Sequence, residues 1–174
     1  MFFFDDKIKQ YEQIMDYDTL LLYLEEIFWN DPNEILPAII GYAWYFSIEG
    51  NVNVSPKQYN YQTYLNIWKK YIDIGLEHFT INPVFDFIAG YSLSLHGMYL
   101  DFAFERKYEK EGLKLMKKCV ELSKDISLGK VAENFLINAK SRKRVPLENG
   151  DKICKELFNG DSVLDKYFSE IYAK

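Results

Sequence analysis

Apolar residues recur at intervals of three and four along nearly the whole chain, and no stretch of useful length alternates strictly between apolar and polar residues. This is the period of a helix that buries one stripe of its surface, so the sequence predicts an all-α fold of about eight helices. We expect them near residues 5–15, 17–29, 33–49, 57–79, 83–97, 100–124 and 128–141, with one or two more after residue 150. The clearest loops are residues 49–56 and 144–151, where turn-forming residues gather.

Two of the predicted helices open in the same way. Asp31-Pro32 precedes the third helix and Asn82-Pro83 precedes the fifth. In each pair the polar side chain can accept a hydrogen bond from a free backbone N–H, and proline occupies a position where its missing donor is not needed. Both pairs therefore predict helix starts.

The length of the chain fits a single domain over residues 1–174. Cys119 and Cys154 have no second cysteine or histidine at ligand spacing, so neither a disulfide framework nor a zinc site is predicted. The start MFFFDD lacks the basic segment of a secretory signal, and no apolar run approaches the ~20 residues that span a bilayer. We therefore expect a soluble, cytoplasmic protein that makes no membrane contact.

Two pairs of similar segments indicate how the helices pack. Residues 39–50 and 88–97 both carry Gly-Tyr inside an apolar helix, and each is followed by a Tyr-x-x-x-Gly-Leu helix, at residues 71–76 and 108–113. A glycine inside a helix costs up to about 1 kcal/mol relative to alanine, so its recurrence predicts close contact between helices. The alternation predicts stacked hairpins that pair helices one with two, three with four, five with six, and seven with the C-terminal helices. The phenylalanines at the start should pack against the second helix.

Small and large residues in these helices follow a known motif. Gly90, Leu93, Gly97 and Tyr99 have the spacing of its first helix, Gly112, Met116 and Cys119 have the small-large-small order of its second, and Trp68, Ile72 and Gly75 repeat that order in the preceding unit. Over residues 31–125 the chain resembles the tetratricopeptide repeat family, with ten extra residues, LDFAFERKYE, between the halves of the best unit. The resemblance implies a superhelix whose hollow is lined by the first helix of each hairpin. Tyr42, Tyr45, Tyr91 and Ser94 would project into that hollow.

A narrower resemblance covers residues 60–125. The segments IAGYSLSLHGMY and KYEKEGLKLMKKCVEL, together with the small size and the acidic front half, resemble helical immunity proteins encoded beside bacterial polymorphic toxins. Such toxins include those of contact-dependent growth-inhibition systems. This resemblance implies a protein that binds and neutralises one cognate toxin.

The net charge of −5 is unevenly distributed along the chain. Residues 1–50 hold ten acidic and two basic side chains, whereas residues 101–150 hold eight acidic and twelve basic side chains. Two interpretations stay open, namely solvated helix faces that happen to differ, or an acidic patch that attracts a basic partner. The acidic side chains expected to cluster toward one end are Asp16, Asp18, Glu25, Glu26, Asp31 and Glu34.

Few residues suggest catalysis or cofactor binding. His78 and His96 lie near the ends of different predicted helices, where each can cap the helix or face solvent, and neither a metal-binding HExxH motif nor a glycine-rich phosphate loop occurs. The basic segment SRKRV, residues 141–145, is short and lacks aromatic neighbours, so no nucleic-acid binding is predicted. We therefore predict no catalytic residue, no metal ligand and no cofactor.

An aromatic stripe runs along the fourth predicted helix. Tyr61, Tyr64, Trp68 and Tyr71 follow one another at steps of three, four and three. Such a stripe is usually part of the core and less often a binding surface.

Together these features predict a non-enzymatic, protein-binding protein. The leading hypothesis is an immunity protein, monomeric before complex formation, whose cognate partner is a basic toxin domain. A peptide-binding adaptor of the same repeat class would instead accept short segments in the hollow. An enzyme whose catalytic groups come from distant residues is the third interpretation.

Overall fold

The computed structural model describes residues 1–48, 61–79, 81–123, 126–141 and 143–173, and these residues form helices without a strand. The α-helices are α1 (Asp6–Gln13), α2 (Tyr17–Ile27), α3 (Pro32–Ile48), α4 (Tyr61–His78), α5 (Pro83–His96), α6 (Glu105–Leu122), α7 (Ser127–Lys140), α8 (Gly150–Leu157) and α9 (Val163–Tyr172). Short 3-10 turns are η1 (Phe28–Asn30), η3 (Gly97–Tyr99) and η4 (Phe102–Phe104). The all-α prediction is confirmed. Within the described ranges, no helix combines the length and apolar character needed to cross a membrane.

The start of α6 differs from the prediction. The sequence predicted a continuous helix from residue 100, but η4 comes first and α6 begins at Glu105. Asp101 favours this turn because its carboxylate accepts the backbone N–H of Ala103 at 2.9 Å. The predicted loop 49–56 and the first four residues of the predicted helix 57–79 lie outside the described residues.

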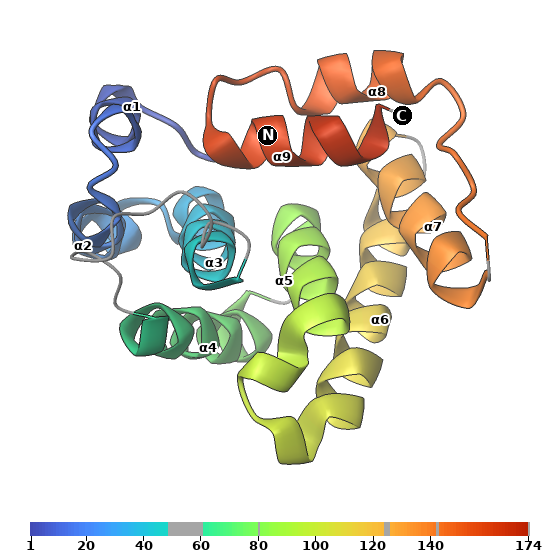
Figure 1. Ribbon diagram of the computed structural model, residues 1–174, viewed down its shortest axis with the longest axis horizontal. Coiled ribbons are helices and arrows are strands. Elements are labelled where there is room, and N and C mark those ends of the chain that lie inside the picture. Colours follow the sequence, from blue (N-terminus) through green and yellow to red (C-terminus); the bar gives the residue numbers. More distant parts are fainter. Residues whose placement is uncertain (49–60, 80, 124–125, 142, 174) are drawn as a thin grey trace.

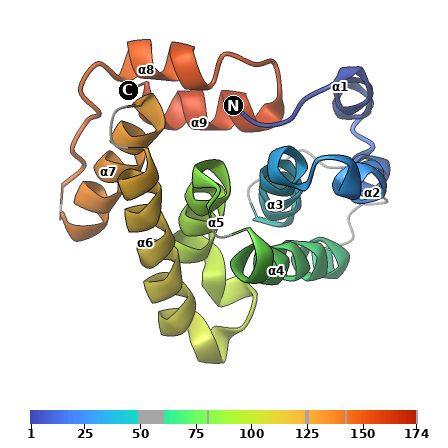
Figure 2. The ribbon, with the colours of Figure 1, turned by 180° about the vertical axis from the view of Figure 1, so that it is seen from behind.

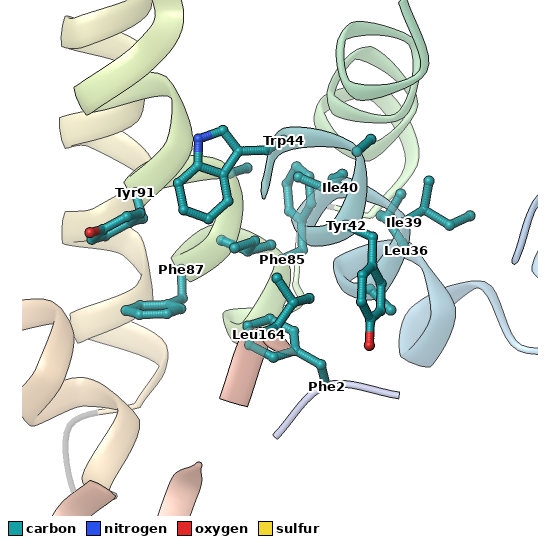
Figure 3. Close-up of a cluster of buried hydrophobic side chains, with 14 of the residues drawn as sticks. Phe2, Leu36, Ile39, Ile40, Tyr42, Trp44, Phe85, Phe87, Tyr91 and Leu164 are labelled. Carbon is teal, nitrogen blue, oxygen red and sulfur yellow. The ribbon is translucent and has the colours of Figure 1, made fainter. Parts of the chain in front are cut away.

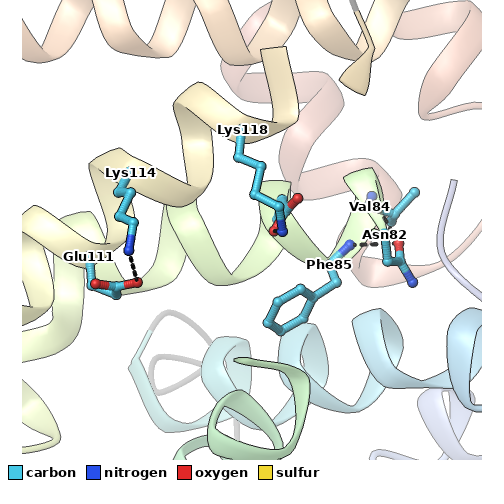
Figure 4. Close-up of polar contacts among 7 residues, drawn as sticks. Asn82, Val84, Phe85, Glu111, Lys114 and Lys118 are labelled. Atoms are coloured by element: carbon cyan, nitrogen blue, oxygen red, sulfur yellow. Dashed lines mark hydrogen bonds and ion pairs between the residues drawn. The ribbon is translucent and has the colours of Figure 1, made fainter. Parts of the chain in front are cut away.

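Polar side chains cap the two helix starts that the sequence predicted. The carboxylate of Asp31 accepts the backbone N–H of Glu34 at 3.2 Å. The side-chain oxygen of Asn82 accepts the N–H groups of Val84 and Phe85 at 3.1 and 3.0 Å (Figure 4). Helices α3 and α5 each begin on the predicted proline, so both predictions are confirmed.

The first six helices pack as three hairpins. Helix α1 contacts α2, α3 contacts α4, α5 contacts α6, and α3 also contacts α5. The C-terminal part departs from the predicted pairing, because α7 packs mainly on α6 while α8 pairs with α9. In Figures 1 and 2, α9 lies across α3 and α5 on the side opposite α4.

Glycines allow the close helix contacts that their recurrence predicted. A Cβ atom at Gly112 would lie 2.6 Å from the backbone nitrogen of Ser94 and 2.8 Å from the carbonyl oxygen of Gly90. The backbones of α5 and α6 therefore touch at this point. At Gly41 a Cβ atom would instead meet Leu164 of α9, at 2.7 Å.

Helix α9 fills the space where the sequence predicted an open hollow. The ring of Phe168 lies 5.0 Å from that of Tyr91 and 5.2 Å from that of Phe87, both on α5. Phe2 also packs on Phe168, with ring centroids 5.7 Å apart, so this phenylalanine contacts α9, whereas the sequence predicted contact with the second helix. Figure 3 shows Phe2 and Leu164 beside the buried side chains of α3 and α5.

The aromatic stripe of α4 belongs to the core. Tyr64, Trp68 and Tyr71 are buried and Tyr61 is half-buried. The indole N–H of Trp68 donates to the hydroxyl of Ser92 at 3.2 Å, which fixes α4 against α5. The usual interpretation of such a stripe therefore holds here.

Candidate partner-binding surface

Tyr42, which was predicted to face the hollow, is fully buried. Its hydroxyl donates to Glu12 Oε1 at 2.7 Å, and the same oxygen accepts the backbone N–H of Val163 at 3.0 Å. Burial raises the pKa of Glu12, and the bonds from Tyr42 and Val163 lower it in part. These three residues join α1, α3 and α9, so Tyr42 does not face a partner in this structure.

The other three residues predicted to line the hollow also contact the chain itself. Tyr91 is buried, and its hydroxyl lies 3.2 Å from the hydroxyl of Tyr167 on α9. Tyr45 is half-buried, with its ring 5.5 Å from that of Tyr167. Ser94 is half-buried against Gly112. Helices α9 and α6 therefore pack against these positions.

The six acidic residues predicted to cluster divide between the two ends of α2. Asp16 caps the start of α2 by accepting the backbone N–H of Thr19 at 3.1 Å, and Asp18 accepts the hydroxyl of Tyr64 at 2.7 Å. The remaining four, Glu25, Glu26, Asp31 and Glu34, lie from the end of α2 to the start of α3. An eleven-residue helix is roughly 16 Å long, so the two groups are separate.

Two large apolar side chains are exposed beside the second acidic group. Trp29 on η1 is 74% exposed, and Ile81 just before α5 is 81% exposed. The ring of the buried Phe28 contacts that of Trp29 at 4.8 Å and that of Phe79 at 6.2 Å. The side-chain amide of Asn82 joins the same two segments by donating to the carbonyl oxygen of Asn33 at 2.7 Å. We call Trp29, Ile81, Glu26, Asp31 and Glu34 the corner surface.

The corner surface combines exposed acidic and exposed apolar side chains. Glu26, Asp31 and Glu34 are exposed. Residues 26–34 and 73–86, the two segments that meet here, contain no lysine or arginine. Lys70, on the neighbouring α4, pairs with Glu25 at 2.8 Å. A partner with a basic surface would therefore be attracted here before the apolar side chains make contact.

Sequence reasoning found the acidic residues of this surface and missed its two exposed apolar residues. Ile81 directly precedes the helix cap Asn82, and Trp29 lies two residues before the cap Asp31. An apolar residue just before a cap usually packs on its own helix. The exposure of Ile81 departs from that pattern, and only the structure shows it.

A second group of exposed apolar side chains lies between α5 and α6, where the chain projects beyond α4 in Figure 1. Phe102 is 75% exposed and Phe104 is 51% exposed. The adjoining groove of about 480 Å³ is lined by charges of both signs, among them Asp73, Lys107 and Glu111. This surface therefore lacks the single sign of charge that characterises the corner surface.

The residues predicted to lack a chemical role can be examined one by one in the part of the chain that the structure describes. No cluster of three His, Cys, Asp or Glu side chains there could hold a metal ion. Burial raises the pKa of the Cys119 thiol to about 12, which disfavours the nucleophilic thiolate, and Cys154 shifts in the same direction. His78 is exposed at the end of α4. His96 is neither a surface residue nor a simple cap, because its Nδ1 accepts the indole N–H of the buried Trp44 at 3.1 Å.

No protein-family model, curated protein or solved structure matches this chain.

Proposed function

We propose that this protein is a non-enzymatic binding protein of the immunity type, which neutralises one cognate toxin by binding it through the corner surface. The observation that carries the proposal is the exposure of Trp29 and Ile81 on a surface that also exposes Glu26, Asp31 and Glu34. Tryptophan is enriched among the few residues that dominate binding energy at protein interfaces. Covering Ile81 alone would contribute about 1.5–3 kcal/mol from its apolar area.

The acidic residues of the corner surface support a basic partner. Toxins that act on nucleic acid need basic surfaces to approach phosphate groups, so they match this charge. Exposed carboxylates raise the rate of encounter, whereas apolar side chains buried in the complex slow dissociation. The two buried, unpaired thiols fit a reducing compartment, so we place the protein in the cytoplasm.

The alternative of a peptide-binding adaptor has less support. It would bind extended segments in the hollow of the stack, beside Tyr42 and Tyr91. Both residues are buried, and α9 packs over the helices that carry them. An adaptor would need α9 to move away.

The proposal is tested by expressing the chain with the toxin domain encoded by the neighbouring gene. We expect the pair to purify as a one-to-one complex and the chain to restore growth of cells that produce the toxin. The double variant with Trp29→Ala and Ile81→Ser should abolish this protection. The single variant Phe102→Ala, on the second exposed surface, should leave it intact. Loss of protection only with Phe102→Ala would overturn the assignment of the surface, and failure of the wild-type chain to protect would overturn the function.

A further inference from the structure

A cavity of about 650 Å³ lies between α5, α7, α9 and the segment that leads from α7 to α8. None of the corner-surface residues lines it. Its volume is within the range of about 300–1,000 Å³ that is common for small-molecule sites. The proposed toxin-binding function does not use this cavity.

The walls of the cavity are held open by polar contacts. The side-chain amides of Asn134 and Asn138 on α7 both donate to the carbonyl oxygen of Val145, at 3.1 and 3.0 Å. The backbone N–H of Val145 donates to Asn138 Oδ1 at 2.6 Å. These bonds fix a non-helical segment beside α7, so the cavity exists before any ligand arrives. A preformed cavity avoids the entropic cost of ordering its walls on binding.

Aromatic rings from three helices meet along one side of the cavity. The ring of Tyr91 lies 5.3 Å from that of Phe135 and 6.3 Å from that of Tyr167. All three residues line the cavity, and the two tyrosine hydroxyls lie 3.2 Å apart. This lining offers aromatic side chains from three helices to a flat ligand.

Two cations and one anion stand at the rim. Lys143 and Arg144 on the segment after α7, and Glu170 on α9, line the cavity and are exposed. The guanidinium of Arg144 donates to the backbone carbonyl of Ile171 on α9 and so connects the two sides. Guanidinium carries five donors and binds carboxylate or phosphate more strongly than a neutral carbonyl. An anionic ligand could therefore engage Arg144 and Lys143 together.

We propose that this cavity binds a small aromatic anion, with its ring beside Tyr91, Phe135 and Tyr167 and its carboxylate or phosphate at Lys143 and Arg144. Both parts are needed, because the ring gains contact only inside the cavity and the charge is recognised only at the rim. An inorganic anion would contact only the basic rim, and a neutral ring would contact only the aromatic lining.

The test is titration of the isotopically labelled chain with naphthyl phosphate and, separately, with naphthoate, followed by NMR and calorimetry. Naphthol and inorganic phosphate are the matched probes that lack the charge or the ring. We expect at least one of the two aromatic anions to bind at least tenfold more tightly than either matched probe, with shifts concentrated at the cavity residues. Which of the two binds more tightly identifies a phosphate or a carboxylate as the preferred group. Equal binding of naphthol or of inorganic phosphate, or no binding of either aromatic anion, would overturn the proposal.

Variants locate the site. Arg144→Gln keeps a donor but removes the charge, and we expect it to weaken binding of the aromatic anion at least tenfold. Lys117→Gln, at an exposed position on α6, removes the same charge elsewhere and should leave binding unchanged. The amide spectrum of each variant shows whether the fold is retained. An unchanged affinity in a folded Arg144→Gln protein would contradict the assignment.

Discussion

The side-chain amide of Asn82 donates to the backbone carbonyl of Asn33 at 2.7 Å, across 49 residues of sequence. The same side chain caps α5 through its oxygen. One buried residue therefore begins a helix and also fixes the segment that carries Ile81 against the segment that carries Trp29. The geometry of the corner surface depends on this pair.

Replacing Asn82 should separate its two roles. Asn82→Ala removes both the cap and the bond to Asn33, and should lower the free energy of unfolding by about 2 kcal/mol. Asn82→Ser keeps a capping oxygen but cannot reach Asn33 with an amide, so we expect a loss of about 1 kcal/mol. Urea unfolding measures both values. No loss in Asn82→Ser would show that the bond to Asn33 adds no stability, and equal losses in the two variants would show that the cap adds none.

Gly112→Ala should destabilise the protein, although alanine is the better helix former. In an open helix the substitution would stabilise by up to about 1 kcal/mol. Here the new Cβ would lie 2.6 Å from Ser94 N and 2.8 Å from Gly90 O, and backbone atoms cannot move aside cheaply. We expect a net loss of about 1–3 kcal/mol in urea unfolding, as in overpacked cores. A gain in stability would contradict the close approach of α5 and α6.

Asp86 should make the protein less stable as the pH rises from about 4 to 6. Its side chain is fully buried on α5, and burial raises its pKa from 3.8 to about 6, although Lys118 lies 3.1 Å away and lowers it in part (Figure 4 labels Lys118). In that pH range the folded protein holds a proton that the unfolded chain has released, so the free energy of unfolding falls with rising pH, by up to about 3 kcal/mol.

Asp86→Asn isolates this effect from Glu12, whose pKa burial also raises. The variant lacks the titrating group, so its stability relative to the wild type should increase between about pH 4 and pH 7. Urea midpoints at several pH values provide the comparison. If the urea midpoints of the two proteins changed in parallel with pH, Asp86 would titrate normally in the folded state.

Helix α9 should be a fixed part of the core. Phe168 is fully buried among rings of α5, of the chain start and of Phe158, whose ring lies 5.5 Å away. Phe168→Ala should therefore cost about 3–5 kcal/mol, the usual range for a buried aromatic side chain. Tyr167→Phe, one residue earlier, removes only a hydroxyl and should cost about 1 kcal/mol. A small loss with Phe168→Ala would mean that α9 is loosely held and that the hollow can open.

The features that the sequence predicted correctly depend on short-range chemistry. Asp31 and Asn82 each bond to backbone groups two or three residues away, so their role is readable from neighbours alone. The contact at Gly90 and Gly112 was predictable because a glycine within a helix is otherwise unfavourable. The helical period likewise needs only local sequence.

The features that the sequence could not supply depend on long-range packing. Tyr91 contacts Tyr167 across 76 residues, and no local pattern indicates that α9 returns to cover α5. A tyrosine in an apolar helix has the same pattern whether it lines a groove or is buried. Trp29 and Ile81 were missed for the opposite reason, because apolar residues beside a helix cap are expected to be buried and these two are exposed.

The measurement that tests the proposed function most directly is the binding kinetics of the wild type and the Trp29→Ala variant with the proposed toxin partner, sought as the product of the neighbouring gene. We predict that Trp29→Ala weakens binding at least 30-fold, equivalent to about 2 kcal/mol, mainly through faster dissociation. Association of the wild type should slow as salt increases, and Glu26→Gln with Glu34→Gln should reduce that dependence. Unchanged binding by Trp29→Ala, or association that does not respond to salt, would contradict the corner surface as the site of partner recognition.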